Sequence, residues 1–248
     1  MGSTTKTISF KDLLAKLPRG EPLSTAALAR HGVSAFRASD LARNGWLVHL
    51  ARGAYMLPGD TLTRDGSLAF LSFQMPGLHV GSKTALDWRG FRQNIAFRET
   101  VTLWGSKPKR LPEWFTQRFP ACYQATQLFD DKLPPKRGLQ PLPLGDPRVL
   151  VSVPERAMLE LLSDVGKEQS LVEAHDLVES LYGLREKVLD ELLLHTTRIK
   201  VVRIAAALAS EMQLPWAHVA AKHSKRIGGG ARWVALTKTG ERLDLRRP

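Results

Sequence analysis

Residues 23–45 read LSTAALARHGVSAFRASDLARNG, and this stretch decides the fold of the N-terminal part of the chain. Ser24 is placed to cap a helix over Thr25–His31, because its side chain can accept hydrogen bonds from the first-turn amides. Ser34 is placed in the same way before a second helix over Ala35–Asn44. A glycine follows each helix and can take the positive φ of a tight turn. Two short helices around a Gly-containing turn predict a helix-turn-helix.

The second of these helices has two distinct faces. Small and apolar residues repeat at helical spacing and predict a packing face: Ala35, Ala38, Leu41 and Ala42. The other side carries the residues that we predict to contact DNA, which are Phe36, Arg37, Asp40, Arg43 and Asn44, with Ser34 at the helix start. Arg and Asn can read base edges in a major groove, and an aromatic ring can meet a thymine methyl. The alternative is a solvated face on which the charged residues form i,i+3 ion pairs.

A hairpin is expected directly after this helix. Trp46–Leu50 alternates like a strand, and Ala54–Leu57 returns after a short turn. Arg52 lies at the tip, where it can reach a phosphate or the minor groove. Together with a helix expected at Phe10–Leu17, these elements predict a winged helix-turn-helix over residues 1–60.

The remainder, residues 61–248, is expected to be a mixed α/β domain with a helical block and a sub-boundary near residue 140. The fold class is therefore α+β. Helices are predicted at Ser67–Phe73, Gly81–Trp88 with Ser82 as its cap, Arg156–Ser163 behind a capping box at Ser152–Glu155, Leu171–Tyr182 behind Ser170, Leu184–His195 and Ile199–Met212. Strands are predicted at Val101–Trp104, Glu113–Phe119 and Cys122–Phe129, and a closing hairpin at Arg232–Leu236 and Glu241–Leu245.

The charge balance favours a polyanionic partner. The chain carries 36 Lys and Arg against 24 Asp and Glu, a net charge of +12 with a pI near 10.1. The charge is segregated, since residues 141–195 hold five bases and eleven acids, whereas residues 196–248 hold eleven bases and three acids. The alternative is that the positive charge serves solubility alone.

Two further basic clusters are candidates for a secondary nucleic-acid or partner surface. The first is Lys107, Lys109 and Arg110, which stand between Trp104 and Trp114. The alternative for it is a basic loop between elements whose tryptophans lie in the core. The second is Lys222, Lys225 and Arg226 in the basic C-terminal part. The sequence does not separate DNA backbone from an acidic protein face as the partner of this second cluster.

The sequence gives no motif for catalysis, a metal or a cofactor, and we expect none. The seven histidines never form HExxH, and Gly228–Gly230 lacks the order of a phosphate-binding loop. Glu155, Glu160 and Asp164 are best explained as the solvated face of a capped helix. Cys122 is the single cysteine, which excludes an internal disulfide. No apolar stretch is long enough for a membrane span and no signal core is present, so a cytoplasmic location is expected.

Several motifs resemble one known family. The segments Leu23–Ala29, Gly32–Ser34, Leu41–Leu47 and Arg52–Gly59 look like the N-terminal winged helix of AbiEi-type antitoxins of type IV toxin–antitoxin (abortive-infection) systems. Gly81–Gly90, Ser152–Leu162 and the basic region Lys225–Trp233 are similar to later parts of that family. The resemblance implies an antitoxin that counteracts an AbiEii-type nucleotidyltransferase toxin, without a stable complex being required. It also implies autorepression through double-stranded DNA at inverted repeats in the promoter.

Two other functions remain open at this point. One is a stand-alone winged-helix transcription regulator whose C-terminal region senses a ligand or dimerises. The other is a nucleic-acid-processing enzyme, such as a nuclease, that uses the winged helix for delivery. A nucleotidyltransferase gene next to this one would favour the antitoxin, and metal-dependent cleavage of DNA would favour the nuclease.

Overall fold

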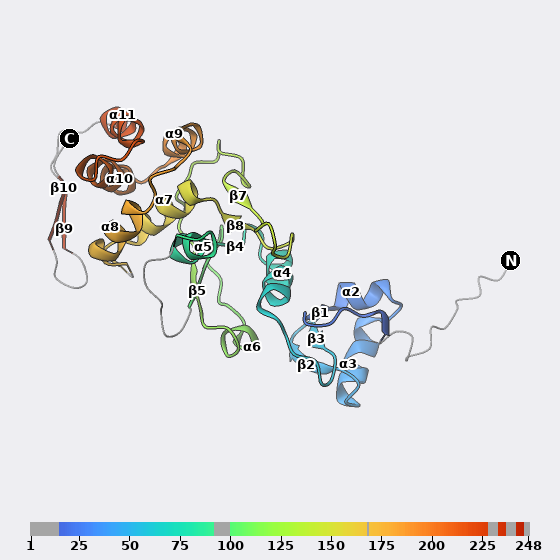
Figure 1. The fold of residues 1–248 in the computed structure, drawn as a ribbon. Coiled ribbons are helices and arrows are strands. Elements are labelled where there is room, and N and C mark those ends of the chain that lie inside the picture. The colour runs from blue at the N-terminus through green and yellow to red at the C-terminus, as the bar shows by residue number, and fades with distance from the viewer. Residues whose placement is uncertain (1–14, 92–99, 168, 228–232, 237–241, 246–248) are drawn as a thin grey trace. The chain divides into compact units, whose positions relative to one another are not determined.

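Figure 1 shows the fold. The structure, a computed structural model, describes residues 15–91, 100–167, 169–227, 233–236 and 242–245. Strands occur up to residue 152, a run of helices follows over residues 154–227, and the sheets are mixed or antiparallel, which confirms the α+β class. The helix predicted at Phe10–Leu17 falls mostly outside the described residues.

The described chain forms two compact units. Unit 1 holds the residues up to Met75 together with Leu111–Phe119. Unit 2 holds Pro76–Arg110 and the residues from Pro120 onward. The chain therefore passes between the units after residues 75, 110 and 119. A domain boundary at residue 60 stays a prediction.

Two short helices follow one another in unit 1, as predicted. α2 spans Thr25–Arg30 and α3 spans Ala35–Arg43. The hydroxyls of Ser24 and Ser34 each accept a hydrogen bond from the amide three residues later, at 3.0 and 3.2 Å, so both N-caps are confirmed. Gly32 makes the turn between the helices with φ 79°, a conformation that favours glycine.

The predicted hairpin follows α3. β2 spans Val48–Ala51 and pairs in antiparallel fashion with β3, which spans Ala54–Met56. A strand that was not predicted, β1 at Leu23–Ser24, pairs with the other edge of β3, so the strand order is β1-β3-β2. The elements of the predicted winged helix after its first helix are therefore present in the predicted order.

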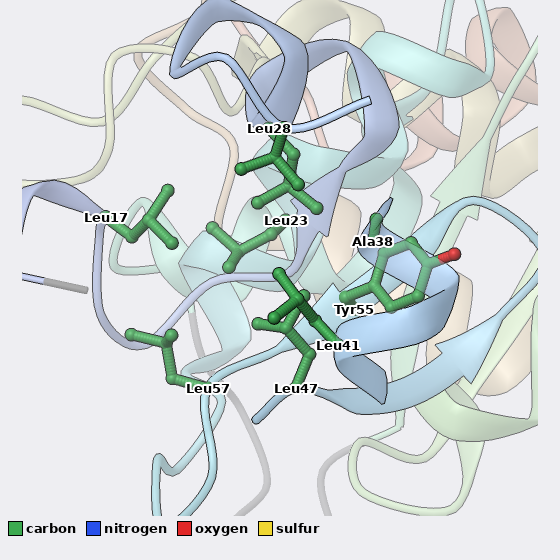
Figure 2. Close-up of a cluster of buried hydrophobic side chains, with 9 residues drawn as sticks. Leu17, Leu23, Leu28, Ala38, Leu41, Leu47, Tyr55 and Leu57 are labelled. Carbon is green, nitrogen blue, oxygen red and sulfur yellow. The ribbon is translucent and has the colours of Figure 1, made fainter. Parts of the chain in front are cut away.

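A small leucine-rich core joins these helices to the hairpin (Figure 2). Its buried members are Leu17, Leu23, Leu28, Val33, Ala38, Leu41, Leu47, Tyr55 and Leu57. Ala38 and Leu41 bring α3 into this core, as the helical spacing predicted. Ala35 was expected on the same face but is exposed, because the packed part of α3 begins one turn later.

The helix of unit 1 that follows the hairpin is α4, which spans Arg64–Gln74. Its cap is Thr63, whose hydroxyl accepts from the Gly66 amide at 3.1 Å and donates to the Gly20 carbonyl at 2.9 Å. The helix predicted here is confirmed, but it begins three residues earlier because the cap lies outside the apolar stretch that indicated it.

The strand predicted at Glu113–Phe119 is wrong, because this segment contains a short helix, α6, at Glu113–Thr116. The Gln117 amide donates to the Glu113 carbonyl at 2.9 Å, the i to i+4 pattern of a helix, and both Trp114 and Phe115 are buried. The Trp114 ring packs edge-on against Phe70 of α4, with the ring centroids 5.9 Å apart. α6 thus completes an aromatic cluster inside unit 1.

Unit 2 is built on a mixed sheet. Its five strands among the described residues are β4 (His79–Val80), β5 (Val101–Trp104), β6 (Ala121–Gln124), β7 (Leu139–Gln140) and β8 (Val151–Ser152), in the order β6-β5-β4-β8-β7. β4 runs parallel to β8, and β5 runs parallel to β6. The other two pairings are antiparallel. β5 matches its prediction, and β6 is shorter than predicted.

The centre of unit 2 is α7, which spans Pro154–Asp164 and is buried at every residue after Pro154. It contacts four other helices (Figure 1), namely α5 at Ser82–Trp88, α8 at Leu171–Glu179, α9 at Glu186–His195 and α10 at Ile199–Glu211. These helices were predicted within a few residues of their ends. A helix surrounded in this way places its polar side chains in the protein interior.

One helix of this block was not predicted. α11 spans Ala217–Ile227 and packs against α9 and α10. Trp216 just before it is fully buried, and its indole N–H donates to the Leu181 carbonyl at 2.8 Å. Strands β9 (Trp233–Leu236) and β10 (Arg242–Leu245) then form the expected antiparallel hairpin. None of the described helices is long and apolar enough to cross a membrane.

Two predicted N-caps in unit 2 are wrong. Gly81, not Ser82, is the N-cap of α5, and Ser82 begins the helix with a φ of 53°. Ser152 was expected to open a capping box ahead of α7, but it lies in β8. Both serines are directed to one buried carboxylate, since Glu160 accepts from the Ser82 amide at 3.1 Å and from the Ser152 hydroxyl at 2.8 Å.

Candidate nucleic-acid interface

The exposed face of α3 carries the predicted DNA-contacting residues. Phe36, Asp40 and Arg43 recur at spacings of four and three residues, so they share one face opposite the core contacts. Phe36 is 80% exposed, so its ring is accessible to a partner surface. Arg37 and Asn44, seven residues apart, lie along one flank of that face and are exposed, as is the cap Ser34.

The structure forms part of the ion pairing that was the alternative explanation for this face. An Arg43 guanidinium nitrogen lies 3.2 Å from Asp40 Oδ1, and the two side chains are 70% and 49% exposed. The Asn44 side-chain amide donates to the Asp40 main-chain carbonyl at 3.0 Å. An exposed pair of this kind contributes little stability, so it leaves Arg43 available to a ligand. None of the described residues pairs with the Arg37 side chain.

The hairpin presents Arg52 in its two-residue turn. Arg52 is exposed, and Gly53 beside it has φ 74°, a conformation that favours glycine at this tip. The Gly53 carbonyl accepts a hydrogen bond from the Thr25 amide at 3.2 Å. The turn is therefore attached to the first residue of α2, which limits the positions that Arg52 can take.

Sequence reasoning missed three residues that join α3 to the hairpin. Tyr55 of β3 is 4% exposed, and its hydroxyl lies 3.2 Å from Ser39 Oγ of α3. The His49 ring of β2 packs edge-on against the Tyr55 ring, at 5.5 Å between centroids. A signal was available, because a buried tyrosine needs a hydrogen-bond partner and the helix before it offers a serine.

The first of the two secondary clusters is exposed but is not interleaved with exposed aromatic rings. Lys107, Lys109 and Arg110 lie in an exposed loop, and the Tyr123 hydroxyl donates to the Lys107 carbonyl at 2.7 Å. Trp104 is 3% exposed and Trp114 is 5% exposed, so both tryptophans belong to cores. A nucleic-acid role for this loop stays a prediction that rests on its charge alone.

The second cluster lies on the exposed side of α11. Lys222 Nζ lies 2.9 Å from Asp190 Oδ1 of α9. Arg226 donates to the Leu194 carbonyl at the end of α9, at 3.1 Å. These two basic side chains thus interact with α9, while Lys225 is exposed. A partner surface here stays a prediction.

The acidic residues of α7 do not form the solvated face that we expected. Glu155, Glu160 and Asp164 are between 0% and 4% exposed, because α7 is surrounded by other helices. Glu155 forms a salt bridge of 2.9 Å with Arg185. One Asp164 carboxylate oxygen has no hydrogen-bond partner among the described residues, and burial raises the pKa of this carboxyl to about 6.

Glu160 is the centre of a buried polar network. Its carboxylate accepts from His79 Nε2 at 2.9 Å and from Arg156 Nε at 2.8 Å, in addition to the two serine contacts. Burial alone would raise the pKa of Glu160, but the charges and hydrogen bonds of His79 and Arg156 outweigh it and lower the pKa to about 2. A Cβ at Gly81 would lie 2.4 Å from the Glu160 carboxylate, so the close approach of the backbone to this network requires glycine at position 81.

Candidate metal ligands do not gather among the described residues. No cluster of three or more His, Cys, Asp or Glu side chains in this part of the chain could hold a metal ion. Cys122 is exposed, and its thiol lies 3.6 Å from the Thr102 hydroxyl, which is not a base. The exposed face of α3 and Arg52 therefore form the candidate site for nucleic acid.

Two family models match the chain. The model described as "Transcriptional regulator, AbiEi antitoxin N-terminal domain" matches residues 6–97. The model described as "Transcriptional regulator, AbiEi antitoxin, Type IV TA system" matches residues 98–245. The two matches together cover nearly the whole chain. No curated protein matches it.

Among solved structures, the chain is similar to the RV2827C protein from Mycobacterium tuberculosis. The TM-score is 0.58 at 14% sequence identity, and the match covers 90% of this chain and 81% of the other. At this identity the likeness concerns the fold alone.

Proposed function

The chain belongs to the AbiEi antitoxin family of type IV toxin–antitoxin transcriptional regulators, and from this membership we propose that it represses its own operon through a winged helix-turn-helix. The observation that carries the proposal is the exposed face of α3, with Phe36, Arg37 and Arg43, in the same unit as the basic hairpin tip at Arg52. Base edges would be read from α3, and Arg52 would bind backbone phosphate. The DNA would be double-stranded promoter DNA with inverted repeats.

The second part of the proposal is the antitoxin role. Family membership supports an activity that counteracts a nucleotidyltransferase-type toxin encoded beside this gene. Unit 2 is our candidate for this activity, because the proposed reading residues of α3 and Arg52 lie in unit 1. The role is tested by growth of cells that express the toxin with and without this protein. Stable co-purification of the two proteins is not required by the proposal.

The DNA-binding part is tested by titrating the protein into DNA from upstream of its own gene and into random DNA, at two salt concentrations. We expect preferential binding to the upstream DNA that survives the higher salt. Arg37→Ala should weaken binding to upstream DNA by ~1–3 kcal/mol and leave random DNA almost unchanged. Arg52→Ala should weaken both DNAs similarly, because a phosphate contact carries no sequence information.

Lys187→Ala is the matched control, because it removes one exposed positive charge from unit 2. We expect it to change neither binding curve. Equal losses on both DNAs for Arg37→Ala would refute its base-reading role. Equal binding of the wild type to both DNAs, abolished by salt, would refute sequence-specific binding altogether.

A further inference from the structure

Tyr55 connects the hairpin to the middle of α3. Its ring lies in the leucine-rich core beside Ala38, and its hydroxyl points away from the leucine side chains (Figure 2). This hydroxyl lies 3.2 Å from Ser39 Oγ, and either oxygen can donate the hydrogen. Ser39 directly precedes Asp40, on the helix that carries the proposed base-reading side chains. The hydrogen bond therefore links the proposed reading face to the hairpin.

A second attachment holds the hairpin at its tip. The Thr25 amide at the start of α2 donates to the Gly53 carbonyl at 3.2 Å, next to Arg52. The hairpin is thus attached to α2 near its tip and to α3 through Tyr55. Two attachments to two different helices fix both the position of the hairpin and its rotation about its own axis.

We propose that the Tyr55 hydroxyl is a positioning group for sequence-specific DNA recognition, acting through Ser39 to set α3 and Arg52 at the spacing of a major groove and its neighbouring phosphate. This inference rests on the DNA-binding function proposed above. Simultaneous contact to base edges and to backbone requires both parts to be held before DNA arrives, because ordering them on binding costs affinity. Random DNA makes no base contacts and does not depend on that spacing.

The hydroxyl, rather than the ring, is the part that carries this role. The ring fills the core and packs against His49 of β2, so it also stabilises the fold. Tyr55→Phe keeps the ring and removes only the hydrogen bond to α3. Ser39→Ala removes the same bond from the other side and, being at the surface of α3, leaves the core intact.

The experiment measures binding of the full chain to upstream and to random DNA for wild type, Tyr55→Phe, Ser39→Ala and the double variant. Each single variant should lose about fivefold in affinity for upstream DNA and less than twofold for random DNA, as expected for one neutral hydrogen bond. The double variant should lose no more than either single variant, because both remove the same interaction. Tyr182→Phe, which removes an exposed tyrosine hydroxyl in unit 2 outside the candidate basic surfaces, is the matched control and should bind as the wild type does.

Three outcomes would overturn the proposal. If Tyr55→Phe lowers the melting temperature but binds both DNAs as the wild type does, the hydroxyl serves stability alone. If Ser39→Ala weakens both DNAs and Tyr55→Phe weakens neither, Ser39 contacts the DNA directly. If the two losses add in the double variant, the residues act independently. Wild-type protein that does not prefer upstream DNA would refute the proposed function instead, so the two failures are distinguishable.

Discussion

Replacing Glu160 with glutamine tests whether one buried carboxylate holds the centre of unit 2 together. The carboxylate is fully buried and accepts four hydrogen bonds, from His79, Arg156, Ser152 and the Ser82 amide. Glutamine has nearly the same shape but turns one acceptor oxygen into an NH₂ group, which must then face donors. It also leaves the largely buried Arg156 guanidinium without its counter-charge.

Two routes give the size of the effect. Removal of one partner from a buried ion pair costs about 3–5 kcal/mol. The pKa of Glu160 gives an independent figure, because folding lowers it from 4.5 to about 2. At about 1.36 kcal/mol for each pH unit, this corresponds to roughly 3 kcal/mol of folding free energy at neutral pH. We therefore expect Glu160→Gln to lower the free energy of unfolding by about 3 kcal/mol at pH 7.

The assay is urea unfolding followed by circular dichroism at pH 7 and at pH 3. Since the pKa of Glu160 is depressed in the folded state, its contribution is present above pH 4.5 and is lost as the pH falls toward 2. The difference between wild type and variant should therefore shrink at pH 3. Glu191→Gln is the control, because it breaks the partly exposed pair with Arg137 and should cost less than about 1 kcal/mol. A cost for Glu160→Gln no larger than this control, or equal at both pH values, would refute the argument.

Two further predictions concern other buried groups. Trp114→Ala should lower the free energy of unfolding of unit 1 by about 3–5 kcal/mol, because Trp114 is 5% exposed and packs against Phe70. The control Phe73→Ala removes a residue that is 79% exposed and should change the free energy of unfolding by less than about 0.5 kcal/mol. Urea unfolding of both variants measures the two effects. Asp164→Asn should raise the free energy of unfolding at pH 7.5 by roughly 1–3 kcal/mol. The pKa of Asp164 is raised to about 6, so the folded state favours the protonated carboxyl, and the wild type loses stability as the pH rises through 6. Unfolding measured at pH 4 should show a much smaller gain, and an equal gain at both pH values would contradict the assignment.

The local signals of the N-terminal part were sufficient to predict α2, α3 and the hairpin, but not β1. Ser24 and Ser34 cap the helices that they were expected to cap, and Gly32 takes the positive φ that its position required. These features depend on interactions within about four residues, which a sequence displays directly. The exposure of Phe36 and Arg37 follows from the same helical spacing.

Interactions between distant segments account for what the sequence did not predict. The acidic residues of α7 are spaced as on a surface helix. Glu160 can nevertheless be buried, because distant partners such as His79, 81 residues earlier, donate hydrogen bonds to its carboxylate. α11 escaped detection because a buried histidine, His223, replaces an apolar residue on its packed face and is paired with Asp190 of α9. The strand predicted around Trp114 failed because its apolar run packs on α4, whose position cannot be read locally.

The division of unit 1 along the chain has a consequence for how such genes can be rearranged. α6 is encoded after β5 but belongs to unit 1, where Trp114 packs against Phe70. Recombination at residue 75 would join residues 1–75 of one parent gene to the α6 of the other parent. Phe70 and Trp114, which pack together, would then come from two different parents. Exchange of the whole of unit 1 needs two further crossovers, one on each side of Leu111–Phe119. We therefore expect the two units to be transmitted together, rather than exchanged as separable modules.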